Sequence, residues 1–135
     1  MTRKVLKIGI APLADIRART IAIARGEFTP GPGDPRVWFT SVESLAQVLS
    51  SKNQRLLDTI KRVRPGSLKE LARLAGRQES NLSRTLRTME RYGLVKLARS
   101  KEGTLVPSVP YDRVLFDFSL DRARPGARPT SEAAE

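Results

Sequence analysis

The chain has 135 residues, of which 39% are hydrophobic, and a formal net charge of +11 at pH 7. Cysteine and histidine are both absent, which excludes disulfides, thiolate metal sites, cysteine nucleophiles and the usual proton shuttle near neutral pH. We therefore expect no catalytic residues, no metal site and no cofactor. The apolar stretches are much shorter than the roughly 20 residues that span a bilayer, so we expect a cytoplasmic protein with no membrane partner.

The N-terminal segment predicts a β-α arm. Residues 3–10 alternate between two faces, which is the period of a strand. One face of this strand carries the apolar side chains Leu6, Ile8 and Ile10. Pro12 suits the first turn of a helix, which we expect to continue to about Arg25.

The composition changes twice along the chain, and these changes suggest the domain boundaries. A Pro- and Gly-rich segment (TPGPGDPR) has neither a helical nor a strand pattern. The last fifteen residues contain almost no large apolar side chain. We therefore predict a β-α arm at 1–28 that dimerises, a linker at 29–36, a main domain at 37–120 and a disordered tail at 121–135.

The main domain contains the signals of a helix-turn-helix. Two helices are expected at 42–49 and about 53–63, because apolar residues recur there at spacings of three and four. Ser67 and Glu70 then form a capping box that begins a third helix, and Gly76 can end it in the left-handed conformation. A fourth helix follows within a few residues and ends near Tyr92. Two short helices joined by a tight Gly-containing turn are typical of the helix-turn-helix.

The fourth of these helices separates apolar from cationic side chains. At about 100° per residue, Leu82, Leu86 and Met89 fall within a stripe about 60° wide. Arginines on one face repel one another unless an anion lies there, and arginine suits bidentate contacts with phosphate and guanine. On the opposite side of the helix, about 140–200° around the axis from Leu82, lie Ser80, Arg84, Arg87 and Arg91. The pattern predicts a DNA recognition helix at about 78–92, and the alternative is a basic face with no partner.

A β-hairpin is expected directly after this helix. Residues 94–99 and 104–109 have strand patterns, and 100–103 form a turn. Such a hairpin is the wing of a winged helix-turn-helix, although its charges could also serve only solubility. Another alternating segment at 111–120 predicts a C-terminal strand with an apolar face. The expected fold is therefore α+β, mainly α: a winged helix-turn-helix with an N-terminal β-α arm and a C-terminal strand.

The distribution of charge agrees with a polyanionic partner. Residues 52–104 contain 14 Lys and Arg but 5 Asp and Glu, so this segment carries nine of the eleven net positive charges. We expect base contacts from Ser80, Asn81 and Arg84, assisted by Gln78 and Arg87. We expect phosphate contacts from Lys69, Arg77 and Arg91, and wing contacts from Arg99 and Lys101.

Several motifs in the main domain resemble a known family. They are Ser41-Val42-Glu43-Ser44-Leu45, Ser67-Leu68-Lys69-Glu70-Leu71-Ala72, Gly76-Arg77, Asn81-Leu82-Ser83-Arg84, Met89-Glu90-Arg91-Tyr92-Gly93-Leu94-Val95 and Val109-Pro110-Tyr111-Asp112. Over about residues 38–120, and in its β-α arm, the chain resembles small winged-helix transcriptional regulators related to MarR-like and ArsR-like repressors. Such proteins are often the antitoxins of toxin–antitoxin operons. The resemblance implies a dimeric autoregulator that has double-stranded DNA and a toxin protein as partners.

Three functions remain open from the sequence. The first is a sequence-specific regulator of transcription that binds double-stranded DNA as a homodimer. The second is an antitoxin whose main task is to bind a toxin, because a small chain has difficulty burying both apolar strand faces. The third is a basic protein without sequence preference, of the nucleoid or RNA-binding type, although few aromatic residues are available for base stacking. The dimer or partner interface is expected at Leu6, Ile8, Ile10, Val114, Phe116 and Phe118.

Overall fold

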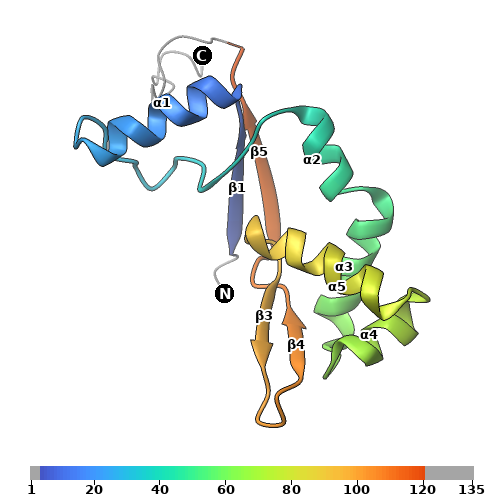
Figure 1. The fold of residues 1–135 in the computed structure, drawn as a ribbon. Coiled ribbons are helices and arrows are strands. Elements are labelled where there is room, and N and C mark those ends of the chain that lie inside the picture. Colours follow the sequence, from blue (N-terminus) through green and yellow to red (C-terminus); the bar gives the residue numbers. More distant parts are fainter. Residues whose placement is uncertain (1–3, 121–135) are drawn as a thin grey trace. The chain divides into compact units, whose positions relative to one another are not determined.

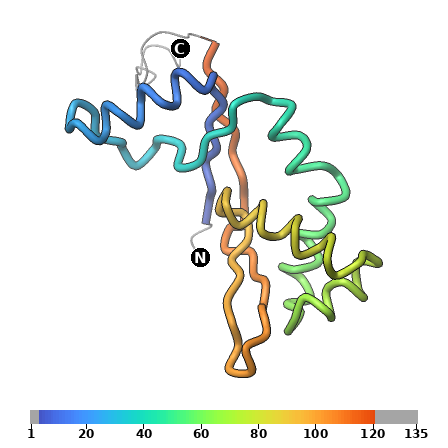
Figure 2. The backbone as a smooth tube through the Cα atoms, viewed as in Figure 1, coloured from blue at the N-terminus to red at the C-terminus, as the bar shows by residue number. Residues whose placement is uncertain are grey.

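The computed structural model describes residues 4–120, which form five helices and two small sheets (Figures 1 and 2). In chain order the elements are β1 (Val5–Ile10), α1 (Leu13–Ala24), β2 (Val37–Phe39), α2 (Val42–Val48), α3 (Ser51–Val63), α4 (Leu68–Ala75), α5 (Glu79–Arg91), β3 (Lys96–Arg99), β4 (Leu105–Ser108) and β5 (Arg113–Phe118). The α+β class is confirmed, and helices α3 to α5 followed by a hairpin have the order of a winged helix. The disordered tail predicted at 121–135 lies outside the described residues.

The chain forms two compact units, and the predicted division differs from the observed one. The helical unit comprises Leu45–Arg113 with Lys4 and Val5, and the sheet unit comprises Leu6–Ser44 with residues 114–120. The sequence prediction instead placed the boundary at the linker, with an arm at 1–28 on one side and a domain at 37–120 on the other. The observed division follows from strand pairing, because β1 is the middle strand of a sheet whose order is β2-β1-β5.

In the sheet unit, α1 connects two parallel strands. β1 pairs with β2 in the register Ile8↔Val37 and Ile10↔Phe39. Gly9 lies opposite Trp38, and a Cβ at Gly9 would be only 2.5 Å from the Trp38 ring carbon Cζ3. The Arg19 guanidinium of α1 lies 5.1 Å from the centre of that ring. Glycine at position 9 therefore allows the Trp38 ring to pack directly against the backbone of β1.

Arg19 also holds the Pro- and Gly-rich linker. Its guanidinium lies 5.2 Å from the centre of the Phe28 ring and 3.8 Å from the Asp34 carboxylate. The side chains of Arg19 and Asp34 are 13% and 14% exposed, so water screens this pair less than it screens a surface ion pair. The Asp34 carboxylate also accepts from the Gly31 amide at 2.8 Å. A segment without helix or strand is thus fixed by one arginine that contacts two aromatic rings.

The expected interface on β1 is corrected by the structure. Leu6, Ile8 and Ile10 are 1%, 0% and 8% exposed, so they belong to the core of the protein and do not form an open face. The side chains of β1, the middle strand of its sheet, project from the faces of the sheet, and the face that carries these three residues is covered by the protein itself. On β5, by contrast, Phe116 and Phe118 are 54% and 50% exposed, while Val114, the third expected residue there, is half-buried. The solvent-exposed part of the predicted interface is therefore on β5.

The helical unit is built around the apolar faces of α3, α4 and α5. The Ser50 hydroxyl caps α3 by accepting from the Asn53 amide, and Arg64 ends the helix in the left-handed conformation at φ 55°. The core of this unit consists of Leu45, Leu56, Ile60, Pro65, Leu68, Leu71, Ala72, Leu82, Leu86, Met89, Leu94 and Val95. The antiparallel hairpin β3–β4 pairs Lys96 with Ser108 and Arg99 with Leu105. The orientation of α5 within the unit is fixed by its three side chains in this core, Leu82, Leu86 and Met89.

Candidate nucleic-acid interface

The start of α4 has the predicted cap with one difference. The Ser67 hydroxyl accepts from the Glu70 amide at 3.0 Å, as a capping box requires. The Glu70 carboxylate, however, accepts from the Gly66 amide at 2.9 Å, one residue before its expected partner. Either arrangement supplies an acceptor for an amide that has no partner within the helix. The predicted beginning of α4 is therefore confirmed.

The turn between α4 and α5 depends on a glycine. Gly76 has φ 66° and ψ 33°, a left-handed conformation that glycine adopts without a Cβ penalty. The Arg77 amide then donates to the Ala72 carbonyl at 3.1 Å, and α5 begins at Glu79. The helix-turn-helix predicted from the sequence is thus present, with three residues between its two helices.

Helix α5 buries its apolar stripe completely. Leu82, Leu86 and Met89 are each 0% exposed. Because these three side chains fix the rotation of the helix, the opposite face must point to solvent. The predicted arginines on that face, Arg84, Arg87 and Arg91, are all exposed. The central sequence inference about this helix, an apolar stripe backed by a cationic ridge, is confirmed.

The guanidinium groups on this ridge have few partners in the protein. The Arg91 guanidinium donates to the Thr88 hydroxyl at 3.3 Å. Within residues 4–120, no hydrogen bond or ion pair engages the guanidinium of Arg84 or Arg87. Two cations therefore stand on one helix face with donors available for an external acceptor.

The first turn of α5 presents polar side chains beside this ridge. Gln78, Ser80 and Asn81 are all exposed, and Gln78 precedes the helix without capping it through its side chain. Amides in the first turn of a helix lack partners within the helix and favour anionic groups. Lys69 on α4 is exposed as well. The residues expected to contact bases are thus grouped at one end of α5.

Arg77 has an internal role that the sequence did not indicate. Its guanidinium nitrogen Nη2 donates to the Asn53 side-chain oxygen at 3.1 Å and to the Lys52 carbonyl at 3.3 Å. The Asn53 amide nitrogen Nδ2 in turn donates to the Val48 carbonyl at 3.0 Å, at the end of α2. One polar network therefore connects α2, α3 and the turn before α5. Asn53 was missed as a site residue, and the only sequence signal was its position three residues after the cap Ser50.

We expect Arg77→Lys to lower the free energy of unfolding by about 1 kcal/mol, because lysine keeps the charge but cannot reproduce both hydrogen bonds to α3. Urea unfolding followed by circular dichroism measures this change. Arg73→Lys is the matched control, since Arg73 is exposed on α4. If both variants unfold at the same urea concentration, Arg77 does not position α5.

The wing is a short hairpin that uses one of its two expected cations internally. The Arg99 guanidinium donates to the Gly103 carbonyl at 2.7 Å and closes the turn, which Gly103 allows at φ 82°. Ser100 adds a bond from its amide to the Thr104 carbonyl at 2.8 Å. Lys101, at the tip, is exposed. Arg99 therefore shapes the wing and Lys101 presents the charge at its end.

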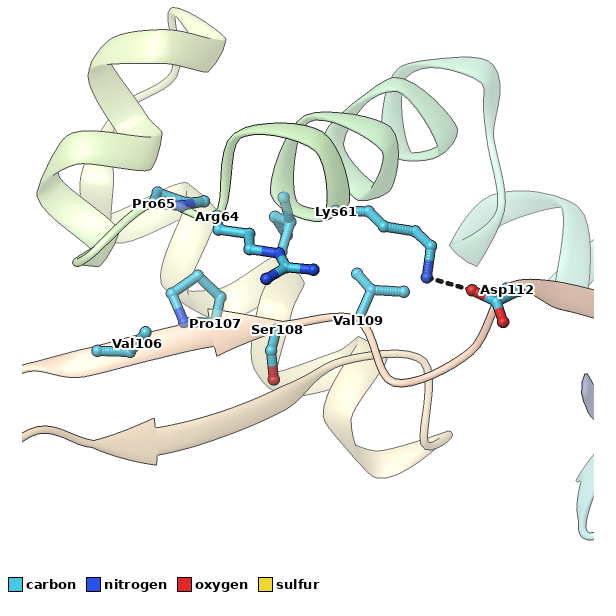
Figure 3. Close-up of a pocket in the computed structure, with 9 residues that line it drawn as sticks. Lys61, Arg64, Pro65, Val106, Pro107, Ser108, Val109 and Asp112 are labelled. Carbon is cyan, nitrogen blue, oxygen red and sulfur yellow. Dashed lines mark ion pairs between the residues drawn. The ribbon is translucent and has the colours of Figure 1, made fainter. Parts of the chain in front are cut away.

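A cavity of about 630 Å³ lies between the end of α3 and strand β4 (Figure 3). Its apolar wall consists of Ile60, Pro65, Val106, Pro107 and Val109. The ammonium of Lys61 lies 2.7 Å from the Asp112 carboxylate and donates to the Tyr111 carbonyl at 3.1 Å. This ion pair connects α3 to the segment that leads into β5. In the part of the chain that the structure describes, no cluster of acidic residues is placed to hold a metal ion, and no helix is long and apolar enough to cross a membrane.

Comparison with known proteins gives a family. Among curated proteins, none matches the chain. The crystal structure of a predicted DNA-binding transcriptional regulator from E. coli is similar, with 24% sequence identity and a TM-score of 0.44 over 52% of this chain and 74% of that chain. The sequence model of the family HVO_A0114 matches residues 48–116, just over half of the chain, and includes all of α4, α5 and the wing. The protein belongs to the HVO_A0114 family.

Proposed function

We propose that this protein is a transcriptional regulator that binds double-stranded DNA with sequence preference through α5. The observation that carries this proposal is the orientation of that helix. Three side chains with no exposed surface fix its rotation, and the arginines on its other face have few internal partners. Helix α5 has 13 residues and is therefore about 20 Å long. A row of guanidinium groups on such a helix suits the major groove, which is wide enough to admit an α-helix.

The contacts divide into two kinds. We assign Ser80, Asn81 and Arg84 to base edges, with Gln78 and Arg87 as neighbours, since the N-terminal part of a recognition helix enters the groove. We assign Lys69, Arg77 and Arg91 to phosphates. Arg77 retains this role because its bonds to α3 use one nitrogen of a group that has five N–H donors. Phosphate contacts set position and affinity, and base contacts set sequence preference.

The wing supplies a further phosphate contact through Lys101, with Arg99 holding the turn. We expect Lys101→Ala to weaken binding to all duplexes by a similar factor. It should also reduce the slope of log affinity against log salt concentration by about 1. Fluorescence anisotropy with operator and random duplexes at several salt concentrations measures both effects. An unchanged salt slope would remove the wing from the interface.

The proposed regulator acts as a homodimer on a pseudo-palindrome, with half-sites about one helical turn apart. Occlusion of its own promoter would make it an autorepressor in the cytoplasm. Selection of bound fragments from a pool of random duplexes tests this proposal. We expect a two-fold symmetric sequence to be enriched. An excess of random duplex should displace this sequence from the protein only poorly. A pool that shows no enrichment despite tight binding would instead indicate a nucleoid-type protein without sequence preference.

The exposed apolar side chains favour a second candidate, an antitoxin that binds a partner protein. In the sheet unit, Leu13 and Ile21 on α1 are 48% and 51% exposed, in addition to the two phenylalanines of β5. Grouped apolar side chains on a surface mark protein interfaces. Co-expression with the product of the neighbouring gene tests this candidate. A stable complex and loss of that product's toxicity would support it, and independent behaviour of the two proteins would contradict it.

A further inference from the structure

We propose that the outer edge of β5 pairs with β5 of a second copy of this chain, antiparallel and around a two-fold axis at Leu115. The inference deepens the homodimer part of the proposed function by naming the surface and the register. It does not depend on DNA binding. It starts from the position of β5, which is an edge strand of the sheet β2-β1-β5.

The backbone of β5 determines which residues can pair outward. The Lys4 carbonyl, directly before β1, accepts from the amide of Asp112 at 2.8 Å and from the amide of Arg113 at 3.2 Å. Asp112 precedes the strand, so Arg113 is the first residue within β5 whose backbone groups point toward β1. Backbone groups of successive residues in a strand point to opposite edges. The N–H and C=O groups of Val114, Phe116 and Phe118 therefore point to the outer edge. Such a row of groups is a template for another strand.

The side chains of β5 do not protect this edge. Edge strands are usually protected by lysine, proline, a bulge or a covering segment. The centre of β5 is Val114-Leu115-Phe116 instead, and Leu115 and Phe116 are 39% and 54% exposed. Neither a proline nor a lysine occurs between Arg113 and Phe118. An edge whose centre is apolar and aromatic is expected to be covered in the folded assembly.

The charges at the two ends of the strand select the partner and the register. With Leu115 on the two-fold axis, Arg113 of each copy stands opposite Asp117 of the other, so two pairs of opposite charge form. Val114 then stands opposite Phe116 of the second copy, and both have backbone groups that point outward. A shift of the register by two residues keeps the hydrogen bonding but leaves Leu115 opposite Asp117. The strand is thus complementary to itself, as an isologous dimer requires.

The existing contacts of Asp117 are compatible with this arrangement. Its Oδ2 atom lies 3.7 Å from the Lys7 ammonium, and the Asp117 side chain is 34% exposed. A carboxylate has two oxygens and accepts from more than one cation. Arg113 is exposed, and within residues 4–120 no ion pair engages its guanidinium. Both members of the proposed pair are therefore available at the edge.

Charge reversal tests the register in the full-length chain without DNA, by sedimentation velocity. Arg113→Asp and Asp117→Arg each place like charges opposite each other twice, and we expect each to raise the dimer dissociation constant about tenfold or more. An equimolar mixture of the two variants pairs only opposite charges, so a heterodimer should form with nearly wild-type affinity. Arg17→Asp, an equal charge change on an exposed residue of α1, should leave dimerisation unchanged.

An engineered disulfide provides a second test, which does not depend on whether the Asp117→Arg variant folds. Leu115 would face its counterpart in a non-hydrogen-bonded pair, where Cα atoms are about 4.5 Å apart, within the range of a disulfide. Because the chain has no cysteine, Leu115→Cys introduces a single thiol. We expect rapid covalent dimers under mild oxidation. The control Leu13→Cys, on the exposed face of α1, should give few.

The outcomes separate this inference from the proposed function. A wild-type chain that stays monomeric at tens of micromolar overturns the pairing, as does an Arg113→Asp variant that dimerises like the wild type. Failure of Leu115→Cys to form more covalent dimer than Leu13→Cys also overturns it. Binding of a single DNA half-site through α5 is measured separately and tests the proposed function alone. Arg113→Asp should bind that half-site as the wild type does, because Arg113 is not among the residues assigned to DNA.

Discussion

Arg84→Ala should lower the affinity for the selected operator by roughly 10- to 100-fold, while affinity for random duplex changes little. The expected loss corresponds to about 1–3 kcal/mol, the usual discrimination from one good bidentate contact with a base. The physical reason is the position of Arg84, which is exposed on the face of α5 opposite the buried stripe and close to the first turn. Titration of operator and random duplexes at one salt concentration measures the ratio of the two affinities.

The matched control for this prediction is Arg17→Ala. Arg17 is an exposed arginine on α1, in the sheet unit, so its removal changes the net charge by the same amount. A loss of operator affinity equal to that of Arg84→Ala would show that net charge and not the α5 face determines binding. Equal losses on operator and random duplexes in Arg84→Ala would assign that arginine to a phosphate.

Leu86→Ala should lower the free energy of unfolding by about 2–5 kcal/mol, because truncation of a fully buried leucine removes apolar burial and leaves a cavity. Leu86 is 0% exposed and lies between Leu82 and Met89 in the stripe that holds α5. Urea unfolding followed by circular dichroism measures the change. A loss of this size is a large part of the stability of a small domain.

The control for Leu86→Ala is Leu74→Ala on α4, where the leucine is 43% exposed and the expected loss is much smaller. If the two variants lose similar stability, the stripe of α5 does not anchor the helix. The arginine face would then have no fixed direction, and the assignment of α5 as the recognition helix would lose its basis.

The helix-turn-helix could be predicted from the sequence because its signals are local. A serine cap, a left-handed glycine and apolar residues at spacings of three and four each act within one or two turns of helix. Ser67, Gly76 and the stripe from Leu82 to Met89 all behave in the structure as these rules require. The direction of the arginines follows from the same periodicity, so the main part of the candidate site was predictable.

The sheet was not predictable in the same way, because its pairing joins segments that are far apart in the chain. The alternation of β1 correctly indicated a strand, but alternation does not say whether a strand is central or at an edge. Ile8 was therefore expected at an interface and is instead buried. The hydrogen bond between Arg77 and Asn53 likewise joins residues 24 positions apart, and no local sequence pattern predicts it.

The most direct test of the central claim is a nuclear magnetic resonance titration of the protein with the selected duplex. We expect the largest changes in amide shifts at the first half of α5, around Ser80 to Arg84, and at the wing tip around Lys101. The buried residues of β1, such as Ile8, should shift little. Binding to duplex that leaves the amides of α5 unperturbed, with the largest shifts elsewhere in the chain, would contradict the claim that this helix contacts DNA.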